Sequence, residues 1–178
     1  MKEQKFNPFE DRLSRNIRND LSESLLDVLE THTTMPAQRV AETYLRQDLP
    51  PVYRAYIRDR LDRYDQALQA LPAKKINCLL QAAILWDLEL FFEVHEILEP
   101  EWIDAQGDQK LMLQALIRAA GVYLYIELGY RDRAEKISHK AIPILKKFKD
   151  DILKYLDANQ LISALETLPD IPPRISKS

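Results

Sequence analysis

FFEVHEILEPEW, residues 91–102, sets one histidine and four glutamates among aromatic and aliphatic side chains. An α-helix turns by about 100° per residue, so on a helix His95 and Glu99 share one face with aromatic side chains. The neighbouring flank carries, at helical spacings, Glu89, Glu93 and Glu96. We therefore expect a helix over residues 88–102 that turns the His95–Glu99 pair inward and leaves the other three glutamates in solvent.

The same helical period continues on both sides of this stretch, and strand-like alternation is rare. With three glycines in 178 residues, the composition also favours helices. These patterns predict an all-α fold, a compact helical bundle of about seven helices. In the first half of the chain we expect helices over 9–30, from Pro36 to Arg46, up to about Leu71, over 74–86 and over 88–102. A long helix should begin at residue 107 and end at Gly129. A capping box at Asp132 and Glu135 should open the next helix, which Pro143 kinks or shortens, and a last helix should cover 158–168.

Prolines and changes of pattern divide the chain into three parts. Residues 1–73 are expected to form an N-terminal helical extension packed on the core. Residues 74–168 are expected to form the helical core domain with the HEILE motif. The tail, residues 169–178, has the sequence PDIPPRISKS, whose three prolines and lack of helical period predict a frayed end.

Charge and cysteine content narrow the classes of partner and compartment. The formal net charge is −3, and the arginines of residues 54–63 alternate with aspartates, so no nucleic-acid partner is expected. The most apolar stretch, residues 76–92, is interrupted by polar side chains, so no membrane span is expected. Cys78 is the single cysteine, which excludes an intrachain disulfide. The beginning of the sequence lacks the apolar core of a signal peptide, so we expect a cytoplasmic protein.

A buried carboxylate needs a hydrogen-bonding partner, and His95 lies one helical turn before Glu99. The helix expected from residue 107 carries further polar side chains along one stripe. Gly121 lies on the same stripe, and a close approach of another backbone there would explain a glycine within a helix. We expect a polar cluster within an apolar shell. Its members are His95, Glu96, Glu99, Trp102, Gln114, Arg118 and Tyr125.

Two blocks of sequence resemble the bacterial and archaeal domain-of-unknown-function 309 family. The first has an aromatic residue, then E-x-H-E-x-x-E and a tryptophan, carried here by Phe92, Glu93, His95, Glu96, Glu99 and Trp102. The second has L-Q-x-L-I and a helix of small residues ending in glycine, carried here by Leu113, Gln114, Leu116, Ile117, Ala120 and Gly129. The resemblance extends over residues 87–150 and implies a compact all-α bundle without an established activity. Arg118 and Tyr125 depart from the family pattern.

The residues leave two functional interpretations open. In the first, the protein is a binding or interaction module with a structural His–Glu polar cluster in its core. The acidic segment 87–106 and the basic segment 131–149 then favour a homo-oligomer or a protein partner.

The alternative is a small hydrolase or metal-binding enzyme that uses His95 and Glu99, with Arg118 as a third catalytic candidate. The motif HEILE lacks the second histidine of the zinc-protease pattern HExxH. No cofactor is therefore expected and no metal site is assigned, although His95 and Glu99 remain candidate ligands. Whether the protein is an enzyme stays open at this level.

Overall fold

The fold comes from a computed structural model of the chain, which describes residues 5–177; residues 1–4 and Ser178 lie outside this description. The chain forms two compact units, Met1–Lys75 and Ile76–Ser178. The sequence-based boundary lies two residues earlier. That residues 1–73 pack on the core stays a prediction, and each unit is described by itself.

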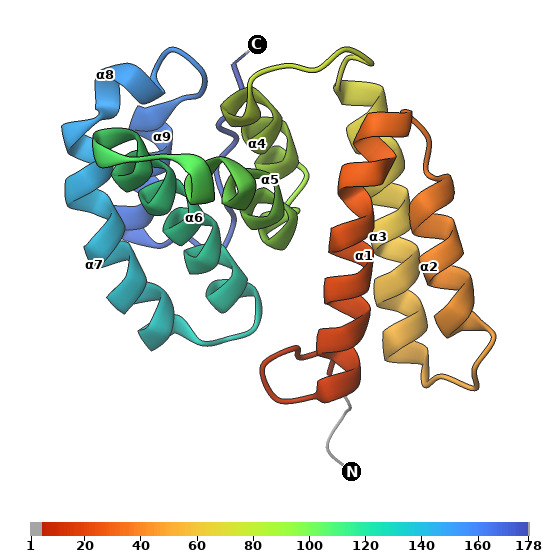
Figure 1. The fold of residues 1–178 in the computed structure, drawn as a ribbon. Helices are drawn as coiled ribbons and strands as arrows, with labels where there is room; N and C mark the ends of the chain where they lie inside the picture. Colours follow the sequence, from red (N-terminus) through yellow and green to blue (C-terminus); the bar gives the residue numbers. More distant parts are fainter. Residues whose placement is uncertain (1–4, 178) are drawn as a thin grey trace. The chain divides into compact units, whose positions relative to one another are not determined.

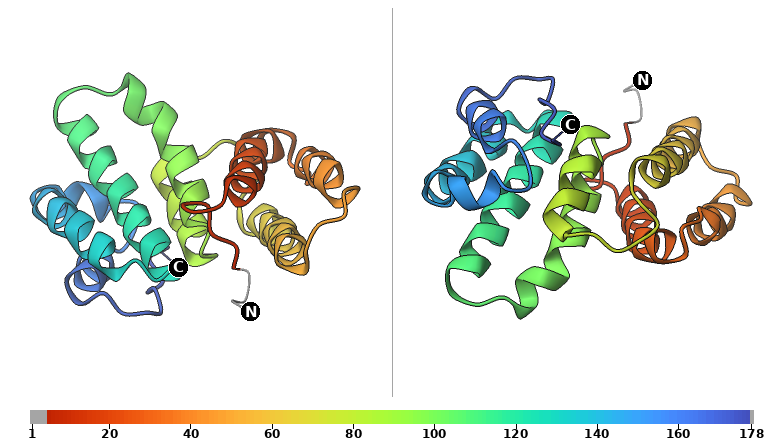
Figure 2. Two further views of the ribbon diagram at one scale, coloured as in Figure 1. Left: turned by 90° about the horizontal axis from the view of Figure 1, so that it is seen from below. Right: turned by 90° about the horizontal axis from the view of Figure 1, so that it is seen from above.

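The N-terminal unit is a bundle of three helices, α1 (Arg12–Thr31), α2 (Met35–Leu45) and α3 (Pro51–Ala70), and each helix contacts the other two. They run side by side in Figure 1 and form a triangle when viewed nearly along their axes in Figure 2. Prolines in the first turns of α2 and α3 help to set where these helices begin. The apolar stripe expected for the first helix is the buried one, with Ile17 and Leu21 fully buried against Ile57.

Asp11 fixes the start of α1 and ties it to α3. Its carboxylate accepts hydrogen bonds from the backbone N–H groups of Leu13 and Ser14 at 3.2 and 2.9 Å, and from the hydroxyl of Tyr53 at 2.7 Å. Burial alone would raise the pKa of Asp11, but the hydrogen bonds from Ser14, Tyr53 and the backbone outweigh it and lower the pKa to about 2. Asp11 therefore contributes most to stability in its charged form.

We expect Asp11→Asn to weaken the acid sensitivity of this unit. The pKa of Asp11 is lower in the folded than in the unfolded state, so its contribution is complete above pH 4 and is lost as the pH falls toward 2. Asparagine still caps the helix but cannot titrate, which removes about 1–2 kcal/mol of pH-dependent stability. Urea unfolding followed by circular dichroism at pH 5, 4 and 3 measures this slope. Asp27→Asn, at an exposed position of the same helix, should keep the wild-type slope, and equal slopes in all three proteins would contradict the assignment.

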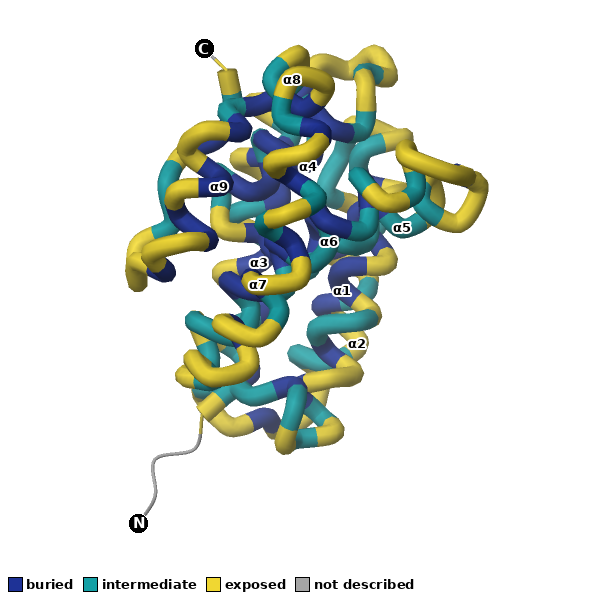
Figure 3. The backbone as a smooth tube through the Cα atoms, turned by 90° about the vertical axis from the view of Figure 1, so that its left-hand side faces the viewer, coloured by how far each residue is buried: buried dark blue, intermediate teal, exposed yellow. Residues whose placement is uncertain are grey.

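The C-terminal unit contains the remaining helices. They are α4 (Cys78–Asp87), α5 (Phe91–Asp104), α6 (Gly107–Glu127), α7 (Arg131–Lys147), the single turn α8 (Lys149–Ile152) and α9 (Ala158–Thr167). Helices α4 to α7 pack in chain order, each on the next, and α9 returns to contact α6 and α7 (Figure 1). The buried stretches of these helices face one another, and exposed stretches form the outside of the unit (Figure 3).

Three aromatic side chains form the centre of this unit. Trp86, Phe91 and Tyr123 are at most 2% exposed, and their ring centroids lie 5.0 to 5.3 Å apart. The hydroxyl of Tyr123 is buried and has no hydrogen-bond partner among the described residues. Burial raises its pKa to about 12, against a lowering effect of Arg131. Tyr123 therefore stays neutral and acts here as an aromatic core residue.

The all-α class is confirmed, with nine helices among residues 5–177 where about seven were expected. One reason is α8, whose four residues are too short to show a helical period. The expected capping box is wrong, because α7 begins at Arg131 without a side-chain cap. The chain also continues helically through Pro143 to Lys147. A Cβ at Gly121 would meet no atom within 4 Å, so the expected close backbone approach is wrong too.

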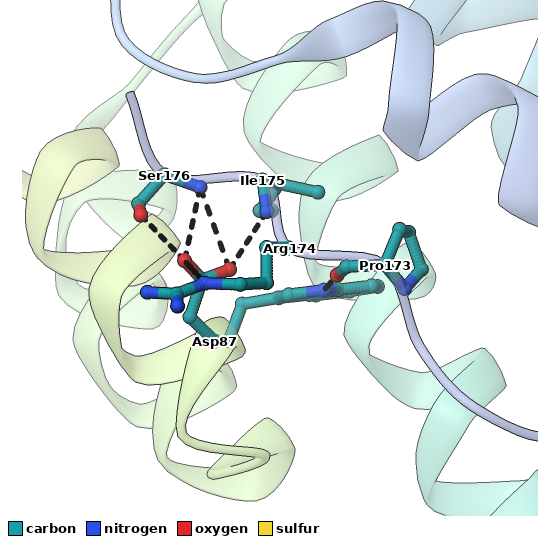
Figure 4. A network of polar contacts seen from close by, with 6 residues as sticks. Asp87, Pro173, Arg174, Ile175 and Ser176 are labelled. Carbon is teal, nitrogen blue, oxygen red and sulfur yellow. Dashed lines mark hydrogen bonds and ion pairs between the residues drawn. The ribbon is translucent and has the colours of Figure 1, made fainter. Parts of the chain in front are cut away.

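The tail is not frayed, contrary to expectation. Ile175 is 2% exposed, and the indole Nε1 of Trp86 donates a hydrogen bond of 2.9 Å to the carbonyl of Pro173. The carboxylate of Asp87 accepts from the backbone N–H of Ile175 at 2.7 Å and from both N–H and hydroxyl of Ser176 (Figure 4). These partners lie more than 80 residues away in the chain, which is why helical periodicity cannot reveal them.

Between residues 5 and 177, no helix combines the length and the apolar character needed to cross a membrane.

Candidate metal site on helix α5

Helix α5 starts later than expected, after a sharp turn. Leu88, Glu89 and Leu90 lie outside any helix, and Glu89 adopts a left-handed conformation with φ of 56°. The backbone N–H of Leu90 bonds to the carbonyl of Leu85, which closes the end of α4. The expected helix over residues 88–102 is therefore wrong at its beginning, and α5 leaves this turn in its own direction.

Glu93 is the buried carboxylate of α5, which corrects the expected assignment of inward and solvated glutamates. Glu93 is fully buried, whereas Glu96 and Glu99 are half-buried. The reason is the spacing of the apolar side chains. The buried stripe of the motif consists of Leu90, Phe91, Val94, Ile97 and Leu98. Glu93 lies three residues after Leu90 and four before Ile97, so it belongs to this stripe. Its position in the first turn also suits a negative charge.

His95, Glu96 and Glu99 come together on the half-buried side of α5. One ligand atom of each residue lies within 4.8 Å of the others, and Nδ1 of His95 is 3.5 Å from Oε1 of Glu96. The side chain of His95 is 34% exposed and that of Glu96 is 17% exposed. The ring of Phe92 stacks on that of His95, with centroids 5.8 Å apart. Nδ1 of His95, the nitrogen nearest Glu96, is itself buried, so the trio is partly shielded while other atoms of its side chains reach solvent.

The other expected members of the polar cluster have different surroundings. Nζ of Lys110 lies 4.8 Å from the ring centroid of Trp102, whose Nε1 is buried without a hydrogen-bond partner among the described residues. Tyr125 contacts Tyr130 and Arg133 near the end of α6. Gln114 and Arg118 are half-buried on α6. Among the described contacts, no hydrogen bond or ion pair joins either of them to the trio.

The trio offers the donor types of a transition-metal site, one imidazole nitrogen and two carboxylate oxygens. In a tetrahedral zinc site with bonds near 2.0 Å, neighbouring ligand atoms lie about 3.3 Å apart. The 3.5 Å between His95 and Glu96 is near this value, and the three ligand atoms together lie within 4.8 Å of one another. In the described part of the chain, no other set of three His, Cys, Asp or Glu side chains gathers in this way. The two remaining histidines are His32, which caps α1, and the exposed His139 of α7.

The sequence alone indicates His95 and Glu99 as candidate metal ligands and Glu96 only as a member of the polar cluster. Glu96 follows His95 directly, so an argument from helical faces separates the two side chains by about 100°. Both side chains are long enough to bend toward each other, which a helical wheel does not show. A histidine flanked by carboxylates at one and four residues is the signal that could have indicated all three.

Comparison with known proteins places this helix within a family match. Residues 79–137 match the model of a family described as Domain of unknown function (DUF309). No curated protein and no solved structure matches the chain. The matched residues extend from the first turn of α4 into α7 and contain all of α5 and α6. The resemblance of the site-bearing segment to the domain-of-unknown-function 309 family is therefore confirmed.

Proposed function

We propose that residues 76–178 form a binding module that holds a divalent transition-metal ion at His95, Glu96 and Glu99. The observation that carries this proposal is the approach of three ligand atoms to within 4.8 Å on one helix. Two neighbouring carboxylates repel each other, and a cation between them removes this repulsion. The imidazole favours zinc, manganese or iron over calcium and magnesium, which prefer oxygen ligands only.

The local charge supports cation binding. Residues 87–106 contain seven acidic side chains and no Lys or Arg, so the potential around α5 attracts cations. Three protein ligands also leave one position of a tetrahedral ion open. An oxygen or nitrogen atom of a ligand from outside the protein can occupy that fourth position, so the metal ion would let the module bind this ligand. The hydrolase alternative needs a water activated at the same position, and Arg118 then has to reach that position from α6.

Titration of chelator-treated protein with Zn²⁺ and Mn²⁺, followed by calorimetry, tests the proposal. We expect one ion per chain, and we expect His95→Ala and Glu99→Gln each to weaken the affinity by at least about tenfold, or 1.4 kcal/mol. Glu101→Gln is the matched control, since Glu101 is an exposed acid of the same helix outside the trio. Its affinity should stay within about twofold of wild type.

Thermal unfolding supplies a second readout that separates binding from folding. An ion that binds only the folded state at one hundred times its Kd stabilises the protein by about 2.7 kcal/mol. The melting temperature of wild type and of Glu101→Gln should therefore rise with added ion, while that of His95→Ala should not. An equal rise in all three proteins, or no binding by wild type, would rule out the trio as the site.

A further inference from the structure

Residues Pro173–Lys177, here called the tail strand, lie extended along one side of the C-terminal unit (Figure 4). At the end of α4, Trp86 donates to the carbonyl of Pro173, and Asp87 accepts from two successive backbone N–H groups, those of Ile175 and Ser176. The tail-strand groups in these three hydrogen bonds, one carbonyl and two N–H groups, all belong to its backbone. Recognition by α4 therefore depends mainly on an extended backbone.

The connection between α8 and α9 holds the other side of the tail strand. The backbone N–H of Asp157 donates to the carbonyl of Ile175 at 2.8 Å, and Leu156 forms an antiparallel bridge with Ser176. Nζ of Lys177 also donates to the carbonyl of Leu153. The five residues that grip the tail strand, here called the clasp, are Trp86, Asp87, Leu153, Leu156 and Asp157. The clasp thus binds a strand from both sides.

Ile175 supplies the apolar anchor of this contact. Its side chain is 2% exposed and lines, with Trp86, Leu156 and Leu161, the wall of a cavity of about 10 Å³. Arg174 is exposed, and its guanidinium lies 3.4 Å from the carboxylate of Asp87, a contact in solvent that adds little. The specificity of the clasp therefore comes from one buried isoleucine, the backbone around it and the hydroxyl of Ser176.

The chain between α9 and the tail strand lies outside the core. Pro169, Asp170 and Ile171 are exposed, and Ile171 is 82% exposed. The guanidinium of Arg131 holds this connection through the carbonyl of Leu168 at 2.5 Å and the carboxylate of Asp170 at 3.0 Å. Leu168 itself is buried and Pro172 is half-buried, so a different path for the exposed residues between them changes little buried apolar area.

From these contacts we propose that the clasp also accepts the tail strand of a second copy of this chain, giving an exchanged dimer. Every hydrogen bond and the burial of Ile175 can form between chains as within one chain, and only the exposed connection changes its path. A short connection supplies its own strand at an effective concentration of about 1 mM. In dilute solution the tail strand therefore binds the clasp of its own chain, and the fraction of exchanged dimer rises as the protein concentration approaches that value.

Two full-length variants with complementary defects test the exchange. Asp87→Ala has a damaged clasp and an intact tail strand, whereas Ile175→Glu has an intact clasp and a tail strand without its anchor. The 1:1 mixture should form a heterodimer, because one chain offers a free tail strand and the other an open clasp. Sedimentation velocity should show a shift of the mixture toward twice the monomer mass at total concentrations of a few tenths of a millimolar, while each variant alone stays monomeric.

The controls make a negative result informative. Ile171→Glu changes the exposed isoleucine outside the clasp, so its mixture with Asp87→Ala should stay monomeric. Circular dichroism verifies that each variant is folded, and Asp87→Asn with Ile175→Ala replaces the first pair if either chain unfolds. A heterodimer only in the complementary mixtures supports the exchange. Monomers in every mixture of folded chains, or equal dimer formation by the separate variants, would refute it. The test is independent of metal, so its failure leaves the proposed site on α5 unaffected.

Discussion

Replacing Asp87 by alanine is expected to lower the free energy of unfolding of the C-terminal unit by about 3 kcal/mol. The carboxylate is 5% exposed and accepts hydrogen bonds from Ile175 and Ser176. Hydrogen bonds to a charged group are each worth about 1.5–3 kcal/mol, and their loss also frees the buried side chain of Ile175. Asp87→Asn keeps one acceptor oxygen and should lose about half as much.

The sequence offers a selective probe for this measurement. Both tryptophans, Trp86 and Trp102, belong to residues 76–178, so fluorescence during urea unfolding reports on the C-terminal unit. Asp104→Ala removes an exposed acid at the end of α5 and should change stability by less than about 0.5 kcal/mol. A loss for Asp87→Ala no larger than that of this control would mean that the bonds between Asp87 and the tail strand contribute nothing to stability.

Trp86→Ala is expected to have a larger effect than Asp87→Ala, a loss of about 4 kcal/mol. The side chain of Trp86 is 2% exposed and meets Phe91 and Tyr123 edge to face. Alanine leaves a cavity at the centre of the aromatic core and also removes the hydrogen bond to Pro173. Dispersion contacts and apolar burial are lost together.

Trp86→Phe separates these two contributions. Phenylalanine keeps an aromatic ring in the core but cannot donate to Pro173, so we expect a loss of about 1–2 kcal/mol. Urea unfolding followed by the remaining fluorescence of Trp102 measures both variants. If Trp86→Ala loses no more than Trp86→Phe, the hydrogen bond rather than the aromatic packing holds this part of the core.

Helical period, prolines and glycines predicted most of the helices because these signals are local. Pro36 lies in the first turn of α2, and Gly129, which follows the C-cap Leu128 of α6, has φ of 81°, as expected. The expected helices 74–86 and 88–102 put the break between them at residue 87, whereas the turn lies at residues 88–90. Its exact place is hard to predict because a glutamate in the left-handed conformation is uncommon. The break is closed by local backbone hydrogen bonds, among them the one from the N–H of Leu90 to the carbonyl of Leu85.

The candidate site was predictable in composition but not in orientation. The motif of α5 indicated a histidine with carboxylates at helical spacing, and His95, Glu96 and Glu99 do gather. A helical wheel centred on the aromatic side chains predicts the wrong buried face of α5, because it gives them more weight than the spacing of Leu90, Val94 and Ile97. With that spacing, Glu93 falls on the buried stripe. The partners of Arg118 and Gln114 depend on how α5 and α6 cross, which neither helix encodes alone.

The docking of the tail strand also bears on how fast the C-terminal unit folds and unfolds. The bonds from Trp86 and Asp87 to residues 173–176 close a chain loop of 87 to 89 residues. Contacts between neighbouring helices such as α6 and α7 close much shorter loops and form earlier at lower entropic cost. Interactions that form after the folding transition state slow unfolding without speeding folding. We therefore expect the tail strand mainly to lower the unfolding rate of the C-terminal unit, with little effect on its folding rate.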